Sequence, residues 1–189
     1  MVEENTWLRK TAWNKRDEYY TPPILVNAIL PYVPEGSAVW CPFDTDESEF
    51  VIALRRKGFV VIASHIWTGT DFFSCQVPAC DCIISNPPYT RKLEVFERLY
   101  KIEKPFAMVM GLPILNYQQV GTFFLDKDLQ LLIVDKKVSF DGNTASFNNS
   151  YFCYRMLPRD IIFAHLEHNN SKGHFVESRM ATSKPGKAV

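Results

Sequence analysis

The sequence lacks any long hydrophobic run, and no apolar stretch approaches the roughly 18 residues that a membrane-spanning helix needs. Its first residues, Met-Val-Glu-Glu-Asn, also lack the basic start and the apolar segment of a secretory signal peptide. These two absences argue against a membrane protein and against a secreted one. We therefore expect a soluble, cytoplasmic protein with no membrane among its partners.

Net charge is also lacking, because the 189 residues contain 21 Lys and Arg and 21 Asp and Glu. A balanced chain has no overall positive field of the kind that attracts nucleic acids. Residues 168–189 nevertheless hold four cations against Glu177 alone, a net of +3, whereas residues 1–167 hold 17 cations against 20 anions, a net of −3. Since residues 168–189 are also polar and lack periodicity, we expect a flexible tail, with weak phosphate contact as the alternative.

Paired cysteines are absent as well. The five cysteines are an odd number, and none of them forms a Cys-x-x-Cys pair. A structural zinc site needs about four ligands at defined spacing, which this sequence does not offer. We expect reduced, mostly buried thiols and no metal site.

Short apolar segments alternate with segments of helical periodicity along most of the chain. The pattern predicts strands over residues 38–41, 59–63, 82–85, 106–110, 129–134 and 150–156. It also predicts helices over residues 47–57 and 93–101, and a first helix that begins at Pro22 and is ended by Pro31, Pro34 and Gly36. Thr21 is the expected N-cap of the first helix, with Pro22 at its first position. Strands that alternate with helices predict one α/β domain with a doubly wound, mostly parallel sheet and helices on both faces. We place this domain at residues 19–167.

Residues 1–18 precede this domain as an N-terminal arm in which Trp7 and Trp13 are interleaved with basic side chains. Aromatic and basic residues together can stack on bases and contact phosphates. The alternative, which we favour, is that both tryptophans cover part of the core, because tryptophan is usually packed.

The segment Asn86-Pro87-Pro88-Tyr89 directly follows an apolar predicted strand. Ligands of open α/β sheets bind outside the carboxyl ends of the strands, which is where this segment falls. The alternative is an ordinary strand-exit turn, for which Asn and Pro are common residues. The motif and its position together resemble the amino-group methyltransferases that use S-adenosylmethionine, above all the adenine-N6 DNA methyltransferases.

The resemblance implies a Rossmann-like methyltransferase fold and a catalytic role for this turn. The exocyclic amine of adenine is a poor nucleophile because its lone pair is conjugated with the ring. Asn86 and the main-chain carbonyl of Pro87 would accept the two amine hydrogens and direct the lone pair at the methyl group. Pro88 would stiffen the turn. Tyr89 would stack on a base swung out of the duplex.

The resemblance further implies which segments bind S-adenosylmethionine. Tyr20, Thr21 and Pro22 match the first cofactor-contacting segment. Asp71 and Phe72 match the segment that meets the cofactor's adenine, through a hydrogen bond and a flat aromatic face. Phe147 is a candidate second base-stacking face, with plain core packing as the alternative.

Two positions depart from the family pattern. The loop after the first strand usually reads Asp-Pro-Phe-x-Gly-x-Gly, but here Pro42, Phe43 and Asp44 are followed by no glycine. We expect a wider turn or a cofactor held by side chains, with Asp44 meeting its amino or sulfonium region. His65 stands where an acidic residue usually binds the ribose hydroxyls, and imidazole offers fewer acceptors than a carboxylate.

These observations predict an adenine-specific DNA methyltransferase. The sequence leaves no stretch long enough for a separate recognition segment, so sequence choice would come from short loops, the arm, a homo-oligomer or a partner, or would be absent. Two alternatives stay open. The same chemistry could act on RNA adenine or on a protein glutamine, or the chain could be a binding module that has lost its cofactor.

Overall fold

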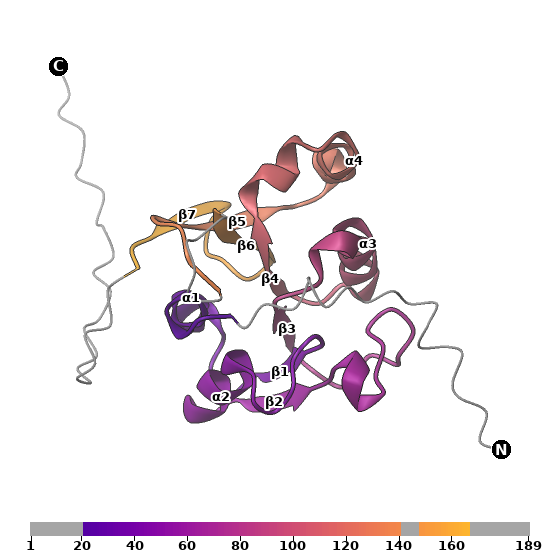
Figure 1. Cartoon of the computed structure of the whole chain (residues 1–189), viewed down its shortest axis with the longest axis vertical. Helices are drawn as coiled ribbons and strands as arrows, with labels where there is room; N and C mark the ends of the chain where they lie inside the picture. The colour runs from indigo at the N-terminus through magenta and orange to yellow at the C-terminus, as the bar shows by residue number, and fades with distance from the viewer. Residues whose placement is uncertain (1–20, 141–147, 167–189) are drawn as a thin grey trace.

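The protein is described here by a computed structural model, which covers residues 21–140 and 148–166. The N-terminal arm and the tail predicted from the sequence, including Trp7 and Trp13, lie outside these residues. A single seven-stranded sheet forms the centre of the molecule, with strands in the order β2-β1-β3-β4-β6-β5-β7 (Figure 1). The strands are β1 (Ala38–Cys41), β2 (Val60–Ala63), β3 (Cys82–Ser85), β4 (Phe106–Gly111), β5 (Gln130–Val134), β6 (Asn149–Tyr154) and β7 (Ile161–Ala164).

Strand β6 is the one antiparallel strand of this sheet. It lies between β4 and β5 and runs opposite to both, whereas the pairs β1–β2, β1–β3, β3–β4 and β5–β7 are parallel. The antiparallel register places Asn149 opposite Gly111, so the start of β6 lies beside the carboxyl end of β4. The prediction of a doubly wound, mostly parallel sheet is confirmed.

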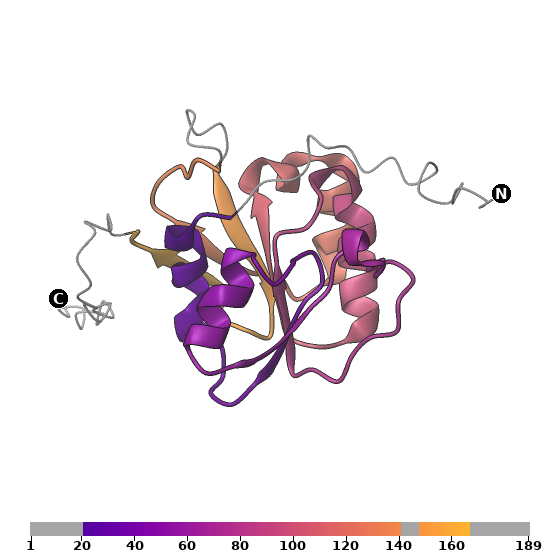
Figure 2. The same ribbon diagram turned by 60° about the horizontal axis from the view of Figure 1, so that its bottom comes forward.

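Helices cover both faces of the sheet (Figures 1 and 2). Helices α1 (Pro23–Ile29) and α2 (Glu49–Arg56) pack on one face, where Leu25, Ile29, Phe50 and Leu54 are fully buried. Helices α3 (Lys92–Ile102) and α4 (Gln118–Phe123) lie on the opposite face, whose core is rich in aromatic side chains. Short 3-10 turns follow several elements, at Leu30–Tyr32, Ile66–Thr68, Tyr89–Arg91, Leu112–Asn116 and Phe124–Asp126.

Helix α1 begins one residue later than the sequence predicts. Pro22, with extended backbone angles, is the N-cap, and Pro23 occupies the first helical position. The expected cap at Thr21 was therefore wrong. Proline at the first helical position leaves no backbone N–H unsatisfied there, and two consecutive prolines allow the helix to start at the second. Thr21 itself is buried.

Two elements, α4 and β7, were not predicted from the sequence. Helix α4 is six residues long, contains Gly121, and is fixed mainly by the burial of Val120. Strand β7 is an edge strand whose Ile161 and Phe163 are exposed. Both are short segments, and tertiary contacts rather than local pattern decide their structure.

The cysteines behave as the sequence predicts. All five are free thiols, and only Cys75 is partly exposed. Within residues 21–140 and 148–166, no cluster of three or more His, Cys, Asp or Glu side chains has the arrangement of a metal site. None of the helices in these ranges has the length and apolarity to cross a bilayer.

Candidate functional site

The carboxyl ends of four parallel strands, β2, β1, β3 and β4, meet at one edge of the sheet. Strand β1 pairs with β2 on one side and with β3 on the other, so the chain reverses its winding direction between β1 and β3. Ligands of doubly wound sheets bind in the crevice at such a reversal. Helix α1 also begins on this side of the molecule and runs back beside the sheet, at the left of Figure 2. The loops that follow these strands are therefore the candidate site.

The loop after β1 folds inward although it contains no glycine. Pro42, Phe43 and Asp44 are all buried. The Phe43 N–H donates to Ser85 Oγ at 3.3 Å, and the Ser85 hydroxyl in turn donates to the Asp44 carboxylate. The Asp44 N–H donates to the Ser64 carbonyl at 3.1 Å. Side-chain and backbone hydrogen bonds thus hold the ends of β1, β2 and β3 together.

Asp44 is a carboxyl group with unusual electrostatics. It is only 6% exposed, and none of the ion pairs in the described part of the chain involves it. Burial raises the pKa of Asp44 to about 6, against hydrogen bonds from the Ser85 and Ser48 hydroxyls that lower it. A buried carboxylate without a cationic partner is complementary to a positively charged ligand group.

The raised pKa makes Asp44 a source of pH-dependent instability. Its folded pKa lies above its ordinary value of 3.8, so the folded state binds this proton more tightly than the unfolded state. Stability from this group is present below about pH 4 and is lost as pH rises to about 6. We expect Asp44→Asn to stabilise the protein at pH 7.5 by about 2–3 kcal/mol, and by about half as much at pH 5. Urea unfolding at both pH values measures this difference.

Asp46→Asn is the matched control, because Asp46 is an exposed acid in the same loop, paired with Arg55 at 2.7 Å. It should change stability little at either pH, since exposed ion pairs contribute little. An Asp44→Asn effect of equal size at pH 5 and pH 7.5 would contradict the assignment.

The Asn86–Tyr89 turn leaves β3 at the centre of this edge. Pro87 and Pro88 are buried, and Asn86 and Tyr89 are partly buried. Pro88 is extended, and Tyr89 starts the short 3-10 turn that leads into α3. The Tyr89 hydroxyl donates to Asn149 Oδ1 at 3.1 Å. The turn therefore holds Tyr89 against the start of β6.

The segment containing Asp71 forms a compact turn next to β1. The Asp71 carboxylate accepts hydrogen bonds from the Phe73 N–H at 3.0 Å and from the Ser74 hydroxyl at 3.1 Å. Phe72 is only 2% exposed, and its ring packs on Phe43 at 4.7 Å between centroids. Phe72 thus presents little open surface in this structure.

His65 follows β2 and is buried. Its Nδ1 accepts a hydrogen bond from the Trp67 N–H at 3.1 Å, and Thr68 completes this capping arrangement. Burial lowers the pKa of His65, which keeps the imidazole neutral at pH 7. One ring nitrogen is therefore engaged in holding the loop.

The structure brings most of the predicted site residues to this one edge. Thr21 and Pro22 lie at the start of α1, and the Asp44, His65 and Asn86 loops follow β1, β2 and β3. Tyr20 and Phe147 lie outside the described residues. Two site residues were missed, Ser85 and Asn149. Ser85 stands directly before the Asn86 turn, which was an available signal, whereas Asn149 carries no local one.

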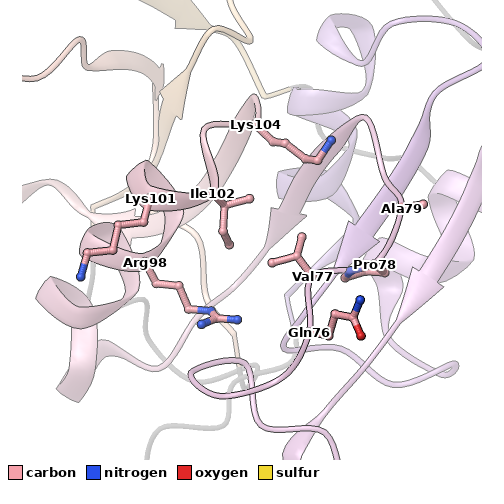
Figure 3. A pocket seen from close by; sticks show the side chains of 8 residues that line it. All are labelled: Gln76, Val77, Pro78, Ala79, Arg98, Lys101, Ile102 and Lys104. Carbon is pink, nitrogen blue, oxygen red and sulfur yellow. The ribbon is translucent and has the colours of Figure 1, made fainter.

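A shallow hollow of about 670 Å³ lies away from this edge (Figure 3). Its residues come from the segment before β3 and from the end of α3, including Gln76, Val77, Arg98 and Lys104. Since Lys104 precedes β4 and Ala79 precedes β3, the hollow is at the amino ends of the strands. It is separate from the candidate site.

Comparison with models of protein families and with curated proteins finds no match to the sequence. Solved structures do match the fold. The methyltransferase subunit of a type I restriction-modification system from Streptococcus thermophilus matches with a TM-score of 0.52 and 14% identity over 84% of this chain. The chain spans 49% of the length of that subunit.

A Listeria monocytogenes protein, assigned to the class I S-adenosylmethionine-dependent methyltransferases, matches with a TM-score of 0.44 and 9% identity. This match covers 85% of the present chain and 69% of the other. A likeness of that strength does not bear on the fold. By the first comparison, the chain has the α/β fold of a restriction-modification methyltransferase subunit.

Proposed function

We propose that this protein transfers a methyl group from S-adenosylmethionine to the N6 amine of adenine in DNA. The observation that carries the proposal is the Asn86–Tyr89 turn at the carboxyl end of β3, next to the buried Asp44 carboxylate that Ser85 holds. An acceptor for amine hydrogens and an anion for a cationic group stand on adjoining strand ends. This pairing suits methylation of an amine by a sulfonium.

The residues present suit this cofactor. S-adenosylmethionine supplies, when bound, an electrophilic methyl group on a positively charged sulfur. Asp44 would face the cation or the amino group, since its buried carboxylate has no cationic partner among the described residues. Asp71 would accept from the adenine amine of the cofactor, and Thr21 and Pro22 would close the pocket from α1. Tyr20, Pro42, Phe43, His65 and Phe72 complete the proposed cofactor contacts.

The protein's part in the reaction is positioning and hydrogen bonding. Asn86 would accept a hydrogen bond from one N–H of the amine, and the Pro87 carbonyl would accept one from the other N–H, which localises the nitrogen lone pair. The paired prolines fix those acceptors before the substrate arrives. Tyr89 would hold the extruded base by its ring. No side chain needs to act as a nucleophile, because the amine itself attacks the methyl group.

DNA is favoured as the methyl acceptor by the structural likeness to a restriction-modification subunit. Since the chain spans 49% of that subunit, residues that choose a DNA sequence would belong to its short loops, its N-terminal arm, a second copy or a partner. The near-neutral net charge leaves RNA adenine and protein glutamine as the competing acceptors.

The proposal is tested by offering the purified chain S-adenosylmethionine with a labelled methyl group and three acceptors: mixed-sequence DNA, RNA and a glutamine-containing protein. We expect label in DNA, recovered as N6-methyladenine by mass spectrometry of nucleosides. Label found only in RNA or only in the protein glutamine would identify that molecule, instead of DNA, as the methyl acceptor. Calorimetry that detects no binding of S-adenosylmethionine would refute the proposal in favour of a non-catalytic module.

Replacing Asp71 by Ala should weaken S-adenosylmethionine binding by about 10-fold or more, because a hydrogen bond to a charged group is lost. Titration calorimetry measures this. Ser74→Ala is the control, since it removes a hydrogen bond of the same turn but keeps the carboxylate. Equal affinities of wild type and Asp71→Ala would remove Asp71 from the cofactor site.

A further inference from the structure

The start of strand β6 carries two polar side chains that are almost completely buried. Asn149 and Ser150 are each 1% exposed. Asn149 Nδ2 and Ser150 Oγ have no hydrogen-bond partner within residues 21–140 and 148–166. Burying a donor without a partner is costly, and native structures rarely keep one without a function or a ligand that uses it.

Asn149 lies at the candidate site, and its amide oxygen is already engaged there. Its position opposite Gly111 puts it at the carboxyl end of β4, next in the sheet to β3 and the Asn86 turn. Its Oδ1 accepts the Tyr89 hydroxyl at 3.1 Å. Because an amide group is planar and rigid, this bond also fixes the direction of Nδ2 relative to the Tyr89 ring.

The side chain of Ser150 provides a contrast on the next residue. Successive side chains of a strand point to opposite faces of the sheet, so Ser150 is turned away from the face of Asn149. Within residues 21–140 and 148–166, no hydrogen bond links the Ser150 side chain to the Asn86 turn, whereas Asn149 bonds directly to Tyr89. Burial is equal for the two residues, but only Asn149 has a connection to the site.

The chemistry of the proposed substrate matches the side-chain amides of Asn86 and Asn149. Adenine carries its N6 amine beside ring nitrogens that accept hydrogen bonds, N1 on one edge and N7 on the other. A site that reads such an edge needs an acceptor for the amine and a donor for the ring nitrogen. Asn86 is the proposed acceptor, and the unpartnered Nδ2 of Asn149 is the matching donor.

We propose that Asn149 is a specificity-determining residue, whose Oδ1 holds Tyr89 and whose Nδ2 donates to the ring nitrogen beside the reactive amine. This inference rests on the proposed function and adds to it a base-reading contact from β6. It makes adenine recognition depend on a residue 63 positions after the Asn86 turn. An aromatic ring and a donor on one rigid unit would then hold the base together.

The test combines DNA substrates that contain adenine analogues with variants of the protein. The quantity measured is the KM for the DNA substrate. In wild type, DNA with either 1-deazaadenine or 7-deazaadenine should raise KM by about 5- to 10-fold, the effect of one lost hydrogen bond. The analogue that lacks the bonded nitrogen identifies the edge. Asn149→Ala should raise KM for ordinary DNA by at least as much and should be insensitive to that analogue. KM for S-adenosylmethionine should stay unchanged.

Two controls share the strand start. Ser150→Ala removes an equally buried, unpartnered group, and Asn148→Ala removes an exposed asparagine. Both should leave KM within 2-fold. If Asn149→Ala does not fold, the KM of wild type for the two deazaadenine substrates still tests whether a ring nitrogen is hydrogen-bonded. Wild type that methylates both analogues with the KM of adenine would overturn the role of Asn149 alone, and wild type that methylates no adenine would overturn the proposed function and this inference together.

Discussion

Asn86→Ala is expected to lower the rate of methyl transfer by about 10² to 10³, the cost of losing one preorganised hydrogen-bonding group from a transition state. One N–H of the amine would lose its hydrogen-bond acceptor, and the lone pair of the amine nitrogen would stay conjugated with the ring. Affinity for S-adenosylmethionine should remain within about 2-fold of wild type, because the proposed cofactor contacts lie on other loops. Single-turnover transfer to DNA and calorimetry measure the two quantities separately.

Thr90→Ala is a suitable control for this substitution. Thr90 is exposed and lies just beyond the same turn, so its loss should leave both quantities unchanged. If Asn86→Ala transfers methyl groups at the wild-type rate, the turn is a structural strand exit only. If it loses affinity for the cofactor and rate in equal proportion, Asn86 belongs to the cofactor pocket instead.

Tyr89→Ala should raise the KM for DNA by about 5- to 150-fold, because stacking of a base on an aromatic ring contributes roughly 1–3 kcal/mol. The increase should shrink on single-stranded or mismatched DNA, where extruding the base costs less. Tyr89→Phe keeps the ring but loses the bond to Asn149, so only a few-fold change is expected. Steady-state kinetics on duplex and single-stranded substrates gives these values.

Tyr32→Ala serves as the matched control for Tyr89. Tyr32 is also a partly buried tyrosine, but it lies in the turn after α1, away from the strand ends of the site. Its loss should affect stability without changing KM. Duplex DNA methylated by Tyr89→Ala with wild-type KM would show that the Tyr89 ring is only part of the core.

The central strands were predictable from the sequence, because each is a buried apolar run that ends in turn residues. Strands β1 and β3 have the predicted bounds, and β2, β4 and β5 differ from prediction by one residue at one end. Strand β6 begins one residue before and ends two residues before its predicted bounds. Helix α4 and strand β7 were not, since Gly121 weakens the helical pattern and β7 is an edge strand formed by its pairing with β5. Their structure depends on neighbours distant in sequence.

The site was predictable only where its residues follow strands. Asn86 and Asp44 stand directly after buried runs, so topology alone brings them to one edge. The bond between Tyr89 and Asn149 joins residues 60 positions apart and exists because β6 enters between β4 and β5. The raised pKa of Asp44 likewise results from burial between three loops. Neither leaves a local pattern in the sequence.

The placement of β6 also determines when the sheet can be completed during synthesis of the chain. A ribosome releases β5 before β6 and β7, which are its only two neighbours in the sheet. Strand β4 must likewise present an open hydrogen-bonding edge until residues 149–154 have emerged. Such an edge is a template for pairing with other chains. The nascent chain therefore has its greatest exposure to aggregation between the synthesis of β4 and that of β6, and the hydrogen bond from Tyr89 to Asn149 forms only when this interval ends.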